Sequence, residues 1–236
     1  MKNIDDMRVS QARLYPTDSL PHMDIIRLNA KSLKEAFAFE SVNTDPFGLS
    51  IIFQNGSVKV DHSVAQVMSV VFEPRKITIG VRGVSKVADK VCDGIHKLLR
   101  SFDTRTEKQE YQPLVKVEDT SCVCTLAIDF DELIASSFAK YMQGEVAAKL
   151  RTVFSVPKSI AFKNLTFEVR YEATDTRLEE HEITLANKSI VIEPRASTPL
   201  QERRFFVSSP TDSETHLSIL RGLEAAIKSG RQKRVD

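Results

Sequence analysis

One stretch of the sequence occurs twice and decides how we divide the chain. Residues 69–75 read SVVFEPR and residues 189–195 read SIVIEPR, so five of the seven positions are identical. In each copy an apolar run ends at a proline, which cannot donate a hydrogen bond to the ladder of a sheet and therefore favours a turn. The repeat indicates an internal duplication. The alternative is coincidence, because Glu-Pro-Arg is a common polar turn.

The elements around the first copy are predicted from apolar spacing and from turn and capping residues. The strongest turn signal is Asn55-Gly56, and a capping pair, Ser32 with Glu35, indicates the start of a helix. The predicted order is a strand at 23–28, a helix from Ser32, strands at 49–53 and 58–60 around Asn55-Gly56, strands at 67–72 and 77–81, and a helix starting at 83–85.

The same order is predicted around the second copy. Alternation over Cys122, Cys124, Leu126, Ile128 and Phe130 indicates a strand, and strands follow at 165–171, 183–185, 190–192 and 204–207. Leu165, Phe167, Val169 and Tyr171 are expected on the core face. Asp129 with Glu132 caps a predicted helix through Met142, and Thr211 with Glu214 caps a last helix that Gly230 ends.

Each half is too small to bury its sheet alone, so we expect one domain with a shared core. The predicted class is α+β, with a duplicated strand-helix-four strands-helix unit, a curved antiparallel sheet and helices on one face. One pseudo-twofold domain then spans residues 1–236, with repeat one at about 23–102, repeat two at about 121–228 and a basic tail at 229–236.

Composition excludes several classes of protein. Charged residues make up 28% and hydrophobic residues 42% of the chain, and 33 basic residues stand against 32 acidic ones. These values are ordinary for globular domains and give no general attraction to nucleic acids or membranes. The apolar runs are far shorter than a membrane span, and acidic residues near the N-terminus argue against export. Cys92, Cys122 and Cys124 fit free buried thiols, and we expect a cytoplasmic protein.

The repeated order of elements over residues 23–228 resembles the saddle of the TATA-box-binding protein family. That resemblance implies one curved antiparallel sheet with helices on its convex side and a prior for binding over catalysis. In the family, phenylalanines on an apolar concave face wedge between base steps. This chain departs from that pattern, because Glu168, Arg170 and Glu172 are expected on the open face of one strand and carboxylates repel phosphates.

Two basic regions are the candidates for nucleic-acid binding. Residues 75–108 hold nine basic and four acidic residues, and the tail is basic. Arg203-Arg204-Phe205-Phe206 adds a basic-aromatic run that could stack bases. The candidate binding residues are Arg75, Lys76, Arg82, Lys86, Arg203, Arg204, Phe206, Arg231, Lys233 and Arg234. An ordinary solvated helix face explains part of this charge equally well.

Other candidate sites are weaker. Gly80 to Lys86 joins a strand to a helix and could hold an anion, but it matches no phosphate-binding motif. Asp129, Asp131 and Glu132 could bind a divalent metal, although helix capping explains them without one. The five histidines lack metal-ligand spacing, and no nucleophile motif is present. We therefore assign no catalytic residue, no metal and no cofactor.

Three functions follow from these patterns. The first is a non-enzymatic module that binds DNA or RNA, or a subunit of a nucleoprotein complex. The second is a metal-dependent phosphodiesterase built on the carboxylates at 129–132. The third is a protein–protein assembly subunit that docks a partner through residues 14–20 and 196–201. A positive open face of the sheet would favour the first function, and a mixed one the third.

Overall fold

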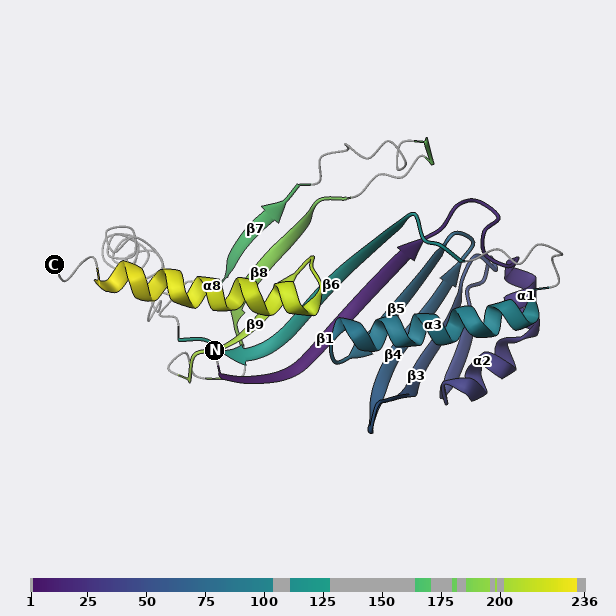
Figure 1. The fold of residues 1–236 in the computed structure, drawn as a ribbon, viewed down its shortest axis with the longest axis horizontal. Helices are drawn as coiled ribbons and strands as arrows, with labels where there is room; N and C mark the ends of the chain where they lie inside the picture. Colours follow the sequence, from purple (N-terminus) through teal and green to yellow (C-terminus); the bar gives the residue numbers. More distant parts are fainter. Residues whose placement is uncertain are drawn as a thin grey trace, which may run out of the picture.

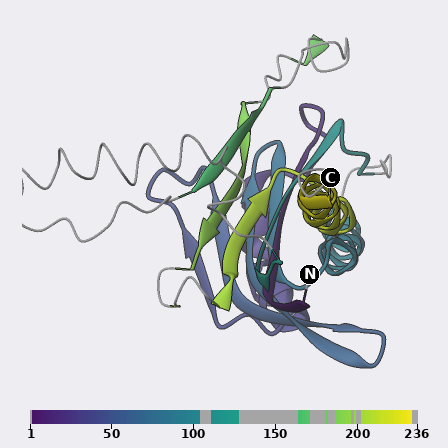
Figure 2. The same cartoon turned by 90° about the vertical axis from the view of Figure 1, so that its left-hand side faces the viewer.

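The strands form a single antiparallel sheet. The computed structural model describes residues 2–103, 111–127, 164–170, 180–181, 186–195, 198 and 202–232. Nine strands in these ranges are ordered β2-β3-β4-β5-β1-β6-β9-β8-β7. The long helices α3 and α8 lie on the same face of the sheet (Figures 1 and 2). The predicted α+β class with an antiparallel sheet is confirmed.

The elements follow one another along the chain with bounds that differ in places from the predicted ones. They are β1 (Lys2–Leu14), α1 (Met23–Leu28), α2 (Ala30–Ala36), β2 (Ser41–Thr44), β3 (Ile51–Val60), β4 (Ser63–Glu73), β5 (Lys76–Arg82), α3 (Ser85–Phe102), β6 (Val115–Thr125), β7 (Leu165–Val169), β8 (Lys188–Pro194), β9 (Arg204–Ser209) and α8 (Ser213–Gln232).

Strand β1 is at the centre of the sheet, and the sequence analysis missed it. It pairs with β5 on one side and with β6 on the other. Its positions that face the helices include Gln11 and Arg13, which both hydrogen-bond to Asp89 of α3. Polar residues thus occupy both faces, so the apolar alternation that marks a strand is absent. The expectation that residues 14–20 form an exposed docking edge is wrong, because Tyr15 and Leu20 are buried.

Residues 23–28 form helix α1 and not the predicted strand. Met23 and Ile26, three positions apart, are both buried, and Arg27 in the last turn bonds Asp24 in the first at 2.6 Å. Both spacings fit a helix and not a strand. A run of six residues is too short for its periodicity to separate the two. The next helix begins at Ala30, so Ser32 lies inside α2 and does not cap it.

The Asn55-Gly56 pair is not a hairpin turn. Strand β3 continues through it, and the chain reverses after Val60, between β3 and β4. Asn55 does have a positive φ of 55°, but within the strand. Gly56 is needed for packing, since a Cβ there would lie 2.5 Å from the ring of Phe39. The polar dipeptide therefore marks an irregular, closely packed point of the strand.

The strand that ends in each copy of the repeated stretch, the strand that follows it and the helix after that strand lie where we predicted them. In the first copy β4 turns at Pro74-Arg75 into β5, and α3 follows with Val87, Val91, Ile95 and Leu99 buried. In the second copy β8 and β9 pair, and α8 follows. Asp212, and not Thr211, caps α8, because its carboxylate accepts the N–H groups of Glu214 and Thr215. The helix continues past Gly230 to Gln232.

In the second half, the bounds of β6 and the burial of β7 differ from the prediction. Cys122 and Cys124 lie in β6 and are buried, as expected, but β6 starts at Val115. Phe167 of β7, predicted in the core, is 49% exposed because it lies on the edge strand of the sheet. The predicted helix through Met142 and the strand at 183–185 lie outside the described residues.

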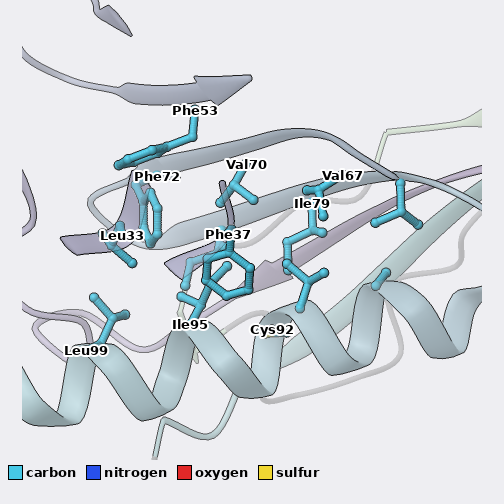
Figure 3. Packing of buried hydrophobic residues seen from close by; sticks show 14 of the residues in the cluster. Leu33, Phe37, Phe53, Val67, Val70, Phe72, Ile79, Cys92, Ile95 and Leu99 are labelled. Carbon is cyan, nitrogen blue, oxygen red and sulfur yellow. The ribbon is translucent and has the colours of Figure 1, made fainter. Parts of the chain in front are cut away.

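Two apolar clusters lie between the sheet and the helices. The larger one packs α3 and α2 on β1, β3, β4 and β5, and Figure 3 shows Cys92, Ile95 and Leu99 of α3 pointing toward the sheet. The smaller cluster includes Cys122, Phe205, Val207 and Leu220 and lies beneath α8. We call these the first and second clusters.

A polar seam lies on the helix-covered side of the β1–β6 pair. Buried Gln11 of β1 donates to the carboxylates of Asp89 and Glu118, each at 2.8 Å, and Lys116 contacts Asp89 at 2.9 Å and Glu118 at 2.6 Å. Burial opposes ionisation of Asp89, but hydrogen bonds from Lys116 and Gln11 outweigh it and lower the pKa of that carboxyl. Gln11 and Glu118 are therefore paired although both are buried, while Asp89 and Lys116 stay partly exposed to water.

The first residues of α3 and α8 bind each other at this seam. The N–H of Ser85 donates to the Ser213 hydroxyl at 3.0 Å, and the N–H of Ser213 donates to the Ser85 hydroxyl at 2.9 Å. Ser85 also donates its own proton to Glu118 at 2.6 Å. Each helix thus supplies an acceptor for a free N–H of the other, which joins the two halves of the molecule.

Candidate functional site

The face of the sheet that carries neither α3 nor α8 is the candidate site, and we call it the open face. Side chains alternate across a strand, so residues next to the helix-facing Val9, Gln11 and Arg13 point the other way. The register then assigns the open face on the four central strands. These positions are Arg8, Ser10, Ala12 and Leu14 of β1, Lys76, Thr78, Gly80 and Arg82 of β5, Val115, Val117, Asp119, Ser121, Val123 and Thr125 of β6, and Arg204, Phe206 and Ser208 of β9.

The middle of the open face carries small or aliphatic side chains. Across the ladder Ser10 lies opposite Gly80 on one side and Asp119 on the other, and Ala12 lies between Thr78 and Val117. Except at Asp119 these positions bear no charge. A partner could therefore approach the backbone of the sheet closely without having to displace long side chains.

A set of charged residues lies on β1, β5 and β9, with β6 between β1 and β9, and we call it the arginine cluster. Arg8 and Arg82, directly opposite in the ladder, both bind Asp6, at 2.5 and 2.9 Å. Arg204 of β9 binds Asp5, the neighbour of Asp6. Three guanidinium groups thus share two carboxylates. The hydrogen bond from Arg8 is the main cause that lowers the pKa of Asp6.

Arg204 has a hydrogen-bonding group to spare. Its Nε atom is buried and has no acceptor among the described residues. A buried donor without a partner is unfavourable, so this position costs free energy in the folded chain. Phe205 is buried and Phe206, on the open face, is half-buried, so Arg204 and Phe206 lie on the same face of β9.

The other predicted basic residues are dispersed. Arg75 bonds the carbonyl of Tyr15, Lys76 pairs with Glu73 at 2.7 Å, and exposed Lys86 lies 4.0 Å from Asp61. Arg203 is exposed next to β9 and has a positive φ of 53°. Arg231 is part of α8, whereas Lys233 and Arg234 lie outside the described residues.

No sequence pattern singles out Asp5, Asp6 and Arg8 as site residues. They lie on β1, for which no strand was predicted, so nothing placed them beside Arg82. The available signal was the charge pattern DDMR at 5–8, which has no meaning until the strand and its neighbours are known.

The charge of the open face is mixed. Lys76 and the three guanidinium groups are balanced by Asp5, Asp6 and Asp119 and by Glu73 and Glu193, which register places on the same side. A polyanion such as nucleic acid needs an excess of positive charge along its path. The mixed charge favours the assembly-subunit interpretation of the sequence.

Neither metal nor membrane chemistry has support in the described part of the chain. Asp129, Asp131 and Glu132 lie outside it, and within it no three His, Cys, Asp or Glu side chains are grouped as metal ligands would be. None of its helices combines the length and apolarity that crossing a bilayer requires. Protein-family models and curated protein sequences give no match to this chain.

Proposed function

We propose that this chain is a non-enzymatic binding module that holds a protein partner on the open face. The observation that carries the proposal is the middle of that face, which is small and uncharged except at Asp119, next to the arginine cluster. Acidic side chains of the partner would meet Arg82 on β5 and Arg204 on β9, while its apolar and small polar residues cover the centre. Core-and-rim arrangements of this kind are typical of protein interfaces.

The size of the sheet is compatible with this function. Nine strands at a spacing of ~4.8 Å span ~40 Å, and seven residues of a strand extend ~23 Å. A flat area of roughly 900 Å² results, close to the ~800 Å² that each partner contributes to a standard interface. A stable complex therefore needs most of the open face.

We also propose that the chain is an internal duplication with a saddle-like arrangement. Strands β5, β4, β3 and β2 follow on one side of β1, and β9, β8 and β7 follow in the same sense on the other side of β6. The two copies of the repeated stretch both run into the turn before the strand that neighbours this central pair. Both facts support the proposal. A cytoplasmic location stays a prediction.

The test is co-purification of the tagged chain from its own cells. We expect Ala12→Glu, which places a charge at the centre of the open face, to lose the partner. The matched control is Lys97→Glu on the exposed surface of α3, which should retain it. Retention by Ala12→Glu, or a wild-type chain that elutes as a monomer with no stoichiometric companion, would reject the proposal.

Nucleic-acid binding is a second candidate, favoured by the location of Arg204 and Phe206 on one face. It predicts salt-dependent retention on a DNA or RNA column. Neutralising Arg203, Arg204, Lys233 and Arg234 together should shift elution to lower salt. Unchanged elution would exclude this function and leave the protein partner.

A further inference from the structure

The second cluster contains a thiol in contact with a histidine whose other nitrogen is fixed. Cys122 Sγ lies 3.3 Å from Nε2 of His216, and Nδ1 of His216 lies 2.7 Å from the hydroxyl of Ser209. The Ser209 hydroxyl in turn lies 2.8 Å from that of Thr211. Nucleophile, base and orienting hydroxyl form one chain, the arrangement that activates a thiol.

Several elements hold these groups in place. Cys122 is on β6, Ser209 ends β9, and His216 is in the first turn of α8, which Asp212 caps. Cys122 and Ser209 are 1% and 2% exposed, and His216 is fully buried. The first turn of a helix carries partial positive charge, which favours a thiolate nearby.

The groups around Cys122 favour its ionised form. A hydrogen bond from the Cys124 thiol, together with the hydrogen bond and charge of His216, lowers the pKa of Cys122 against the opposing effect of burial. Cys124 stays protonated, because Cys122, burial and the charge of Glu224 all raise its pKa.

The first cluster holds a thiol–histidine pair of opposite character, which provides a comparison within the chain. Cys92 lies 3.5 Å from Nε2 of His96, but the same nitrogen lies 2.7 Å from the Tyr15 hydroxyl. Burial raises the pKa of Cys92, and burial with the nearby Arg13 charge lowers the pKa of His96 to about 4. Both groups of this pair are therefore neutral at pH 7.

We propose that Cys122 is a reactive thiolate site that a small, uncharged electrophile of the hydroperoxide class modifies. Its enclosure excludes bulky and charged reagents, whereas hydrogen peroxide is little larger than water. The sulfur of Cys122 attacks one peroxide oxygen and the O–O bond breaks. His216 accepts the proton of Cys122, and the other oxygen, which leaves as hydroxide, takes that proton to form water. Cys122 becomes a sulfenic acid, oxidised by two electrons, and the peroxide is reduced.

The first experiment measures ionisation by the ultraviolet absorbance of the thiolate as a function of pH. We expect one thiolate to titrate with a midpoint below that of an ordinary cysteine, to disappear in Cys122→Ser and to persist in Cys92→Ser. In His216→Gln the midpoint should rise toward the ordinary cysteine value of about 8.5. Absence of a thiolate below pH 7, or its persistence in Cys122→Ser, would overturn the proposal.

The second experiment measures reaction. The folded chain is treated with hydrogen peroxide, and mass spectrometry of its peptides follows oxidation at each cysteine. Cys122 should react at least about tenfold faster than the equally buried Cys92, because it is ionised and has a proton donor for the leaving hydroxide. A sulfenic acid at Cys122 or its product with Cys124 would each support the proposal. Equal rates at Cys92 and Cys122 would contradict it.

Discussion

The contact between Ser85 and Ser213 yields the most specific stability prediction. Each hydroxyl accepts an N–H at the start of the other helix, so Ser213→Ala removes one cap acceptor. Such a loss typically costs about 1 kcal/mol of unfolding free energy. Ser85→Ala removes the matching acceptor and also the bond to the buried carboxylate of Glu118. A hydrogen bond to a charged group contributes about 1.5–3 kcal/mol, so the total for Ser85→Ala is about 3 kcal/mol.

The assay is urea unfolding followed by circular dichroism, with the midpoint compared at an unchanged slope. Ser218→Ala, an exposed position on the same helix, is the control and should change the free energy by less than about 0.5 kcal/mol. The expected order of destabilisation is Ser85→Ala, then Ser213→Ala, then the control. If Ser213→Ala lowers the unfolding free energy as much as Ser85→Ala or more, Ser85 is not the residue that links α3 to both α8 and Glu118 of the polar seam.

Two further predictions concern protonation and close packing. His96 has a lowered pKa in the folded chain, so its stabilising contribution is complete above about pH 6.5, the pKa of an unfolded histidine, and is lost as the pH falls through about 4. The wild type should therefore lose about 3 kcal/mol more than His96→Gln between pH 7 and pH 4 in urea unfolding; parallel pH profiles would contradict this. Gly56→Ala should lower the unfolding free energy by about 1–3 kcal/mol, because its methyl group would overlap the ring of Phe39. Gly222→Ala, where a Cβ meets nothing within 4 Å, should raise the unfolding free energy by about 0.5–1 kcal/mol. If thermal unfolding shows equal effects of the two changes, the contact with Phe39 does not determine the stability at position 56.

The sequence predicts those elements whose burial pattern is simple. Helix α3 shows its buried face as a repeat of apolar residues, and β4, β5 and β9 are apolar runs with clear turns. Strand β1 could not be found in this way, because Gln11 and Arg13 occupy positions that would be apolar in an ordinary core. Their partners Asp89 and Glu118 lie far away in the sequence.

The candidate site could be predicted only in part for the same reason. Arg82, Arg204 and Phe206 are candidates by residue type and by the charge of their segments. The carboxylates that bind the two arginines lie on β1, so the mixed charge of the open face became visible only with the strand order. The thiol–histidine contact joins β6 to α8 across 94 positions of sequence, and no local spacing indicates it.

The polar seam has a consequence for how the molecule opens. Segments that share apolar contacts unfold cooperatively. The first and second clusters are instead joined at the polar seam by hydrogen bonds between charged and amide groups. Native-state hydrogen exchange should then sort the protected amides into two groups with different opening free energies, one on each side of the β1–β6 pair. Breathing of one half while the other stays closed would let the second cluster admit small solutes without global denaturation.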